Sequence, residues 1–153
     1  MKTAAKGLLI LLLLLNASGA FFGGILLITD AGGRSLGMNT ELLAGSPFKD
    51  FLIPGIILLI FNGLLPMLAA VGLLLKRTRR PLAVLPIWRD RQWGWTLALL
   101  SGIALIVWIL VQVAMIGYWK ELIFQPLYLA VGLGIILLAL SPGVKDEYKI
   151  SVS

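Results

Sequence analysis

The chain has 153 residues, of which 59% are hydrophobic and only 13% are charged, whereas a soluble domain carries about 25% charged residues. It contains no cysteine and no histidine, which excludes thiol chemistry, thiolate-bound metals and the commonest general base of enzymes. A net charge of +6 would suggest nucleic-acid binding in a soluble protein. Here the positions of the basic residues explain it as a topology signal instead. We expect an all-α membrane protein of a single domain, with no metal, no cofactor and no nucleic-acid partner.

Four apolar stretches without a charged residue dominate the sequence. Each is about long enough to cross a hydrocarbon core of roughly 30 Å at about 1.5 Å per residue. They lack the alternation of barrel strands, so only helices can satisfy their backbone in lipid. The predicted spans of this four-helix transmembrane bundle cover about residues 7–29, 53–75, 95–117 and 122–140.

The N-terminal stretch needs separate treatment, because it begins like a secretory signal. Lys2 and Lys6 precede a leucine run, and small residues at 17–20 imitate a cleavage site. The apolar stretch continues to Ile28, which is too long for a signal core and right for a span. We therefore expect the first span to be retained.

Basic residues indicate the orientation of the spans. They concentrate before the first span, in the loop at 76–94 and after the fourth span. Cytoplasmic segments carry the excess of lysine and arginine, which predicts both termini in the cytoplasm (N-in/C-in) and an outer loop at 30–52. The strongest cluster is the one in the basic loop, where anionic lipid headgroups could bind. Its members are Lys76, Arg77, Arg79 and Arg80.

Two local patterns predict irregular backbone. Gly45-Ser46-Pro47 is typical of a stop, an N-cap and a first-turn proline, and predicts a short helical turn from Pro47. Pro66 removes a backbone donor inside the second span and predicts a kink there, one turn past Asn62.

The segment around the start of the second span carries a resemblance. The run Ser46-Pro47-Phe48-Lys49-Asp50-Phe51-Leu52-Ile53-Pro54-Gly55 resembles the Ser-Pro-Phe-x-Asp-Phe-Leu-Ile-Pro-Gly motif of an uncharacterised family of small bacterial four-helix membrane proteins. Gln112 in the third span and Gln125-Pro126 at the fourth are similar to that family too. The resemblance implies a bacterial cytoplasmic (inner) membrane and the same topology, and it implies no activity.

Polar residues inside spans are costly and therefore informative. Counted from the outer ends of the spans at about 1.5 Å per residue, Asn62 lies roughly 12 Å deep, Gln112 roughly 7 Å and Gln125 roughly 4 Å. All three fall in the outer leaflet. Trp108 shares a helical face with Gln112, and Tyr128 shares one with Gln125.

If these faces meet near Asn62, they form a polar, aromatic-lined cleft that opens outward. The candidate ligand is amphipathic, such as a lipid or a quinone-like headgroup. The predicted binding residues are Asn62, Trp108, Gln112, Gln125 and Tyr128. The alternative is that the amides only hydrogen-bond across helices and hold the bundle together.

Three functional hypotheses remain open. The leading one is a non-enzymatic interaction or accessory subunit, with membrane lipids and a protein partner or a second copy as partners. The second is an oligomeric transporter or channel for a neutral or amphipathic solute. The third is a lipid-modifying enzyme that uses Glu41, Asp50 or Glu121. No catalytic residue is assigned, because histidine and cysteine are missing.

Overall fold

The computed structural model describes residues 2–75, 91–117 and 124–150. This part of the chain is helical, and its only strand-like pairing is an isolated antiparallel bridge between Arg91 and Lys149. The elements are α1 (Lys2–Thr29), two 3₁₀ turns (Arg34–Leu36 and Thr40–Leu43), α2 (Leu52–Ile57), a π segment (Leu58–Leu64), α3 (Leu65–Leu75), α4 (Trp93–Ile116), α5 (Phe124–Leu140) and α6 (Pro142–Lys145).

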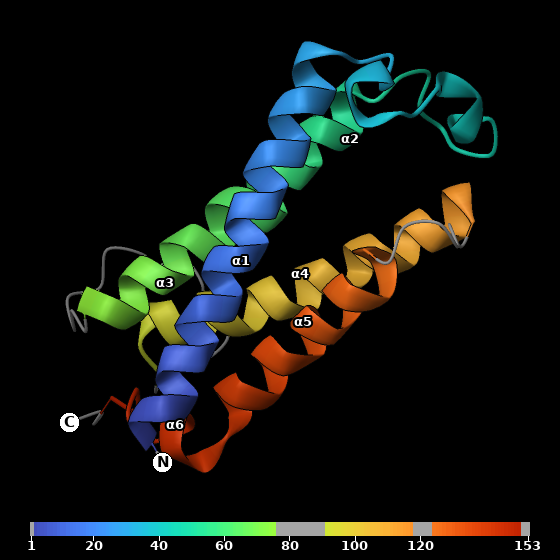
Figure 1. The fold of residues 1–153 in the computed structure, drawn as a ribbon. Helices are drawn as coiled ribbons and strands as arrows, with labels where there is room; N and C mark the ends of the chain where they lie inside the picture. Colours follow the sequence, from blue (N-terminus) through green and yellow to red (C-terminus); the bar gives the residue numbers. More distant parts are fainter. Residues whose placement is uncertain (1, 76–90, 118–123, 151–153) are drawn as a thin grey trace.

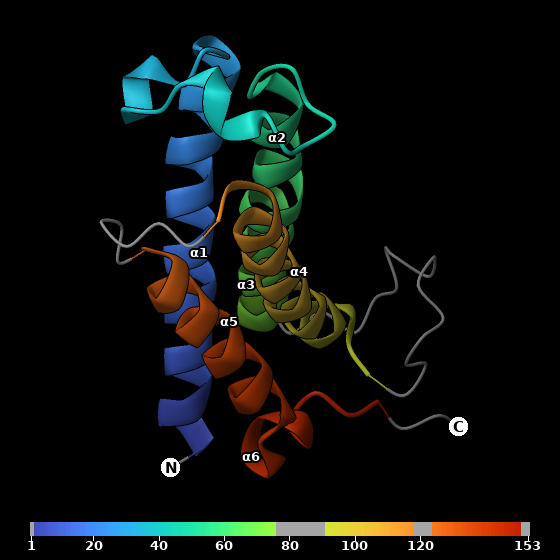
Figure 2. The same cartoon turned by 90° about the vertical axis from the view of Figure 1, so that its right-hand side faces the viewer.

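The long helical stretches alternate in direction: α1, then α2 continued by the π segment and α3, then α4, then α5 (Figures 1 and 2). The long helix α1 packs against α2, the π segment and α3, and α4 packs against α3 and α5. We call the end that carries residues 30–51 the loop end. The opposite end, where α1 begins and α6 lies, is the tail end. In Figure 1 the α1–α2 pair rises away from the α4–α5 pair toward the loop end.

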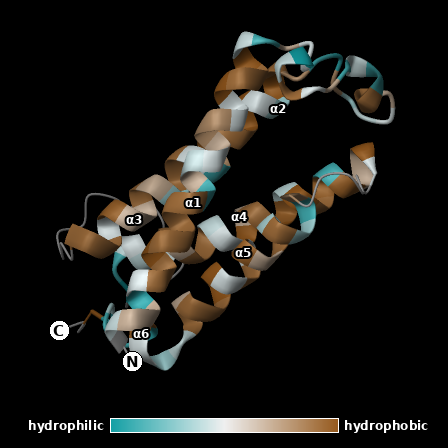
Figure 3. Cartoon of the chain, viewed as in Figure 1, coloured by the Kyte–Doolittle hydropathy of each residue, from teal (hydrophilic) through white to brown (hydrophobic). Residues whose placement is uncertain are grey.

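Three helices are long and apolar enough to cross a membrane: Thr3–Thr29, Leu52–Leu75 and Trp93–Ile116. The fourth apolar helix, α5, is shorter, with 17 residues. Hydrophobic residues dominate the helices in Figure 3, and many apolar side chains are exposed, with Phe22 67% and Leu137 69% exposed. The helical fold with three apolar helices of this length fits a membrane protein, in which such a surface contacts lipid.

The predicted helical turn from Pro47 is wrong. Residues 45–51 form turns and bends, and the 3₁₀ turns come earlier in the loop. The Ser46 hydroxyl accepts the Phe48 N–H at 3.2 Å, and an Asp50 carboxylate oxygen accepts the Leu52 N–H at 3.0 Å. Such side-chain bonds compete with helical backbone bonds, so the helix begins only at Leu52.

The second span leaves α geometry where the sequence predicts an irregularity. Pro66 has no N–H to donate to the Asn62 carbonyl four residues earlier. Residues 58–64 form wider π turns, and the Leu65 N–H bonds to the Ile60 carbonyl five residues earlier. The distortion therefore lies just before the proline.

Consecutive helices cross at reciprocal glycine contacts. A Cβ added to either glycine of a pair would come within 3.3 Å of the backbone of the other. Small residues let helix backbones approach closely. Such close packing stabilises helix pairs in a membrane, because an apolar side chain gains little free energy when it moves from lipid into a helix contact. The pairs are Gly24 with Gly55, Gly72 with Gly94, and Gly102 with Gly132.

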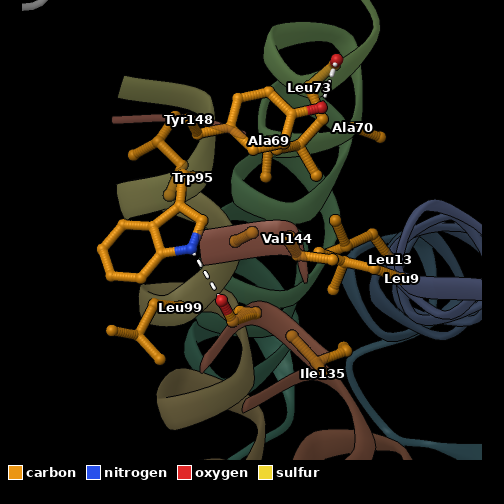
Figure 4. Close-up of a cluster of buried hydrophobic side chains, with 13 residues drawn as sticks. Leu9, Leu13, Ala69, Ala70, Leu73, Trp95, Leu99, Ile135, Val144 and Tyr148 are labelled. Atoms are coloured by element: carbon orange, nitrogen blue, oxygen red, sulfur yellow. Dashed lines mark hydrogen bonds between the residues drawn. The ribbon is translucent and has the colours of Figure 1, made fainter. Parts of the chain in front are cut away.

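The main buried cluster lies toward the tail end (Figure 4). The Trp95 indole donates to the Ala139 carbonyl at 2.7 Å, which joins α4 to α5. The Tyr148 hydroxyl donates to the Leu73 carbonyl at 2.8 Å, and the Tyr148 side chain is fully buried. The segment after α5 thus inserts an aromatic ring between the helices.

Polar contacts fix the same segment at the surface. The Arg91 guanidinium donates to the Lys145 carbonyl and lies 5.5 Å above the Trp95 ring. The Lys6 ammonium lies 3.1 Å from a Glu147 carboxylate oxygen. These contacts connect the start of α1, the start of α4 and residues 141–150 at the tail end.

Candidate functional site

A cavity of about 240 Å³ lies between α1, α4 and α5, on the loop-end side of the buried cluster. Leu36 and Met38 of the 30–51 loop also line it, as does Leu58 of the π segment. The remaining lining residues are Asn16, Gly19, Ala20, Gly23, Leu27, Leu105, Trp108, Ile109, Gln112, Ile116, Phe124, Gln125 and Tyr128.

Four of the five residues predicted to bind a ligand line this cavity: Trp108 and Gln112 from α4, and Gln125 and Tyr128 from α5. Their convergence follows from helical periodicity, because residues three and four apart share one face. The packing of α4 on α5 then brings the two faces together. Whether the four residues bind a ligand stays a prediction.

Asn62, the fifth predicted residue, is not among the lining residues. It is 1% exposed and lies in the π segment, where neither its side-chain nitrogen nor its side-chain oxygen has a hydrogen-bond partner. It therefore sits within the helix packing, outside the cavity.

Asn16 of α1 also lines the cavity. Its depth below the outer end of its span had not placed it with the three amides of the outer leaflet. Its side chain is 1% exposed, and its Nδ2 atom has no hydrogen-bond partner. The α1 lining extends from Asn16 to Leu27, about 16 Å along the helix. Asn16 marks the deep end of the cavity, farthest from the 30–51 loop.

Gln125 connects the beginning of α5 to the end of α4. Its Nε2 atom donates to the Gly117 carbonyl at 3.3 Å. Gly117 has a φ of 76°, a left-handed conformation that glycine adopts readily. This bond holds the Gln125 side chain at the rim of the cavity nearest the loop end.

Tyr128 reaches across the cavity to α1. A Cβ added at Gly19 would overlap the Tyr128 hydroxyl, so the ring can lie against α1 only because residue 19 has no side chain. The Tyr128 hydroxyl lies beside Gly19, about one helical turn from Asn16 along α1. Two polar groups thus lie toward the deep end, and the two glutamines lie toward the loop end.

The other predicted sites receive no structural support. Lys76, Arg77, Arg79 and Arg80 lie outside the described residues, as does Glu121.

Of the three acids considered for catalysis, the two that the structure describes belong to the 30–51 loop. Asp50 accepts the Leu52 N–H and so serves the N-terminus of α2, a role for which an acid is electrostatically favoured. Glu41 is exposed in the second 3₁₀ turn. Neither lines the cavity.

The described lining has apolar walls and uncharged polar groups at both ends. Asparagine, glutamine and tyrosine side chains can donate and accept hydrogen bonds, but none of them is charged. Such a lining suits a mainly apolar molecule with one or two uncharged polar groups.

No protein-family model matches the chain, and searches of curated proteins and of solved structures also found no match.

Proposed function

We propose that this chain is a non-enzymatic, four-span protein of the bacterial cytoplasmic membrane that binds an amphipathic, lipid-like molecule. The cavity between α1, α4 and α5 carries the proposal, because it combines apolar walls with separated polar groups inside a lipid-facing bundle. With both termini in the cytoplasm, the loop end faces outward, and the cavity opens in the outer leaflet. Binding of this kind suits an accessory or interaction subunit that holds a lipid or presents it to a partner.

The four-span topology is supported by length and charge. The helix α5 has 17 residues, or about 26 Å, which nearly matches the hydrocarbon core. All large groups of basic residues fall on one side only if the chain crosses the membrane an even number of times.

Labelling of single cysteines tests the topology, and the natural chain has no cysteine to interfere. We expect a membrane-impermeant maleimide to label Glu41→Cys in intact cells and Asp146→Cys only after permeabilisation. Labelling of both positions in intact cells would contradict the N-in/C-in arrangement.

Transport and catalysis have less support. Intramembrane acids and basic residues usually mark ion and proton pathways, and the described lining is uncharged. Of the three acids considered for catalysis, the two that the structure describes lie outside the cavity.

Native mass spectrometry of the protein in mild detergent, combined with extraction of co-purifying lipids, tests the binding function. Gly23 lines the cavity, and a Cβ there would have only Leu58 as a neighbour, at 3.4 Å. A larger side chain at 23 can therefore extend into the free space. We expect wild type to retain a small amphiphile and Gly23→Leu to lose it.

Gly7→Leu is the matched control, because Gly7 lies on α1 outside the cavity with nothing near its added Cβ. This variant should retain the amphiphile. Equal retention by Gly23→Leu would contradict the proposal. A second polypeptide that co-purifies with wild type would identify the partner of an accessory subunit.

A further inference from the structure

We infer that the ligand carries an uncharged oxygen acceptor, a carbonyl of a quinone or of an acyl ester, which accepts a hydrogen bond from the Asn16 side-chain amide at the deep end of the cavity. This inference rests on the proposed function and specifies the chemistry of its ligand.

The first step is the state of the Asn16 amide. A buried amide without a partner carries an uncompensated desolvation cost, and buried polar groups are nearly always hydrogen-bonded. The Nδ2 atom of Asn16 has no partner within the protein, although the side chain is 1% exposed and lines the cavity. A ligand oxygen in the cavity would satisfy this donor. Because the Nδ2 atom is buried in the ligand-free protein, binding includes a half-turn about the terminal torsion of Asn16, which has a broad and roughly two-fold profile and turns the nitrogen toward the cavity.

Comparison with Asn62 shows why position matters. Asn62 is equally buried and its amide also has no partner. An unpartnered amide is therefore not by itself a sign of binding in this bundle. Of the two asparagines, only Asn16 lines the cavity, where a ligand could supply the missing oxygen.

The second step is the charge of the ligand. A charged group taken out of water needs a paired charge close by. The described lining offers none, and Asn16 lies at its deep end. The group that reaches Asn16 is therefore neutral, as a quinone or ester carbonyl is.

The third step is size. An apolar cavity of about 150 Å³ holds one benzene molecule, and pockets for drug-sized ligands begin at about 300 Å³. The volume of about 240 Å³ admits one substituted ring or part of one chain, but not a whole two-chain lipid. The remainder of such a ligand would extend between the helices into the bilayer.

Photolabelling in nanodiscs tests the inference with three probes that carry the same diazirine-bearing decyl chain. One ends in a benzoquinone, one is an acylglycerol, and one is an alkane without oxygen. Labelled residues are mapped by peptide mass spectrometry. We expect the benzoquinone or the acylglycerol to label lining residues such as Leu105 and Ile109. The probe that labels these residues more strongly identifies the chemical class of the natural ligand, a quinone or an acyl ester. The alkane should label them weakly.

Asn16→Leu removes the amide but keeps the bulk, and it should lower this labelling about tenfold, the effect of losing one buried hydrogen bond. Asn62→Leu makes the same replacement at an equally buried position outside the cavity and should label as wild type does. If Asn16→Leu does not fold, Asn16→Ala carries the same expectation. Thermal unfolding of each variant confirms the fold.

The outcomes separate this inference from the function on which it rests. Full labelling of Asn16→Leu, or equal labelling by the alkane, overturns the role of Asn16, while loss of labelling in Gly23→Leu would still support a binding cavity. Absence of cavity labelling by all probes, or undiminished labelling in Gly23→Leu, overturns the proposed function itself.

Discussion

The buried side chain of Asn62 lowers the stability of the protein. Asn62 has no partner for either polar atom of its side chain and does not contact the cavity. Replacement of an unsatisfied polar group by an apolar one of similar shape removes its desolvation cost. We expect Asn62→Leu to stabilise the protein by about 1 kcal/mol, measured by thermal unfolding in detergent. Asn62→Ala, which leaves a void, should not be stabilising. A large loss of stability in Asn62→Leu would show that the amide has a bonding role in the bundle.

Asp30 gives the 30–51 loop a dependence on pH. The backbone N–H of Ser35, and then its hydroxyl, donate to one Asp30 carboxylate oxygen at 2.8 and 3.0 Å, which holds the pKa of Asp30 below its ordinary value of 3.8. Because the folded pKa is the lower one, the bonds favour the folded loop above pH 3.8 and are lost as the pH falls through the folded pKa.

An NMR titration of the Ser35 amide in micelles measures this effect. We expect a midpoint below 3.8, and Asp30→Asn should abolish the transition. A midpoint at or above 3.8 would show that the bonds do not form in solution.

The sequence identified four residues of the cavity but missed Asn16. Depth counted from span ends excluded it, since Asn16 lies 13 residues below Thr29, or about 20 Å. That count assumes that all spans end at one level. In the structure Gly19, about 15 Å below the end of α1, meets Tyr128, only about 6 Å below the start of α5. The offset between these two helices depends on tertiary packing, which a single sequence does not encode as a local pattern.

At the scale of elements, the length of an apolar stretch predicts well where a helix begins and ends. It predicts poorly which face of the helix points toward its neighbours. The observed helices lie close to the predicted spans because a charged residue or a turn signal limits each stretch. Asn62 was grouped with the cavity by its depth alone, and no helical face was assigned to it. The π segment that contains it has more residues per turn than an α-helix, so a period of 3.6 residues would not have given the direction of its side chain either.

The glycine crossings give a prediction for helix pairs. A Cβ at Gly94 would lie 2.6 Å from the Gly72 carbonyl carbon, and one at Gly72 would lie 2.7 Å from the Gly94 Cα. Backbone cannot move aside as a side chain can, so α3 and α4 must separate. We expect Gly94→Ala to destabilise the protein by about 1–3 kcal/mol, as overpacking does. Gly7→Ala should cause no loss in the same thermal assay. A neutral Gly94→Ala would mean that the crossing is looser than the structure shows.

At the scale of the whole molecule, the two ends of the bundle differ in construction. The tail end combines the buried cluster with the bonds of Trp95 and Tyr148, whereas the loop end contains the cavity. The sequence predicted neither the docking of residues 141–150 nor the burial of Tyr148. A short segment of mixed polarity carries no periodic signal, and its position depends on a groove that exists only after the helices have packed.

This asymmetry predicts how the backbone opens. Only Ile109 is buried in α4 beyond Leu105, so the half of α4 nearer the loop end has few contacts to hold it. Local opening is most frequent where buried contacts are few. In hydrogen exchange of the protein in nanodiscs, peptides from 108–116 should therefore exchange faster than those from 94–102. The benzoquinone or acylglycerol that labels the cavity should slow the first group and leave the second unchanged. Uniform exchange along α4, or equal protection of both halves, would mean that the bundle opens as one unit and that the cavity is not its weak point.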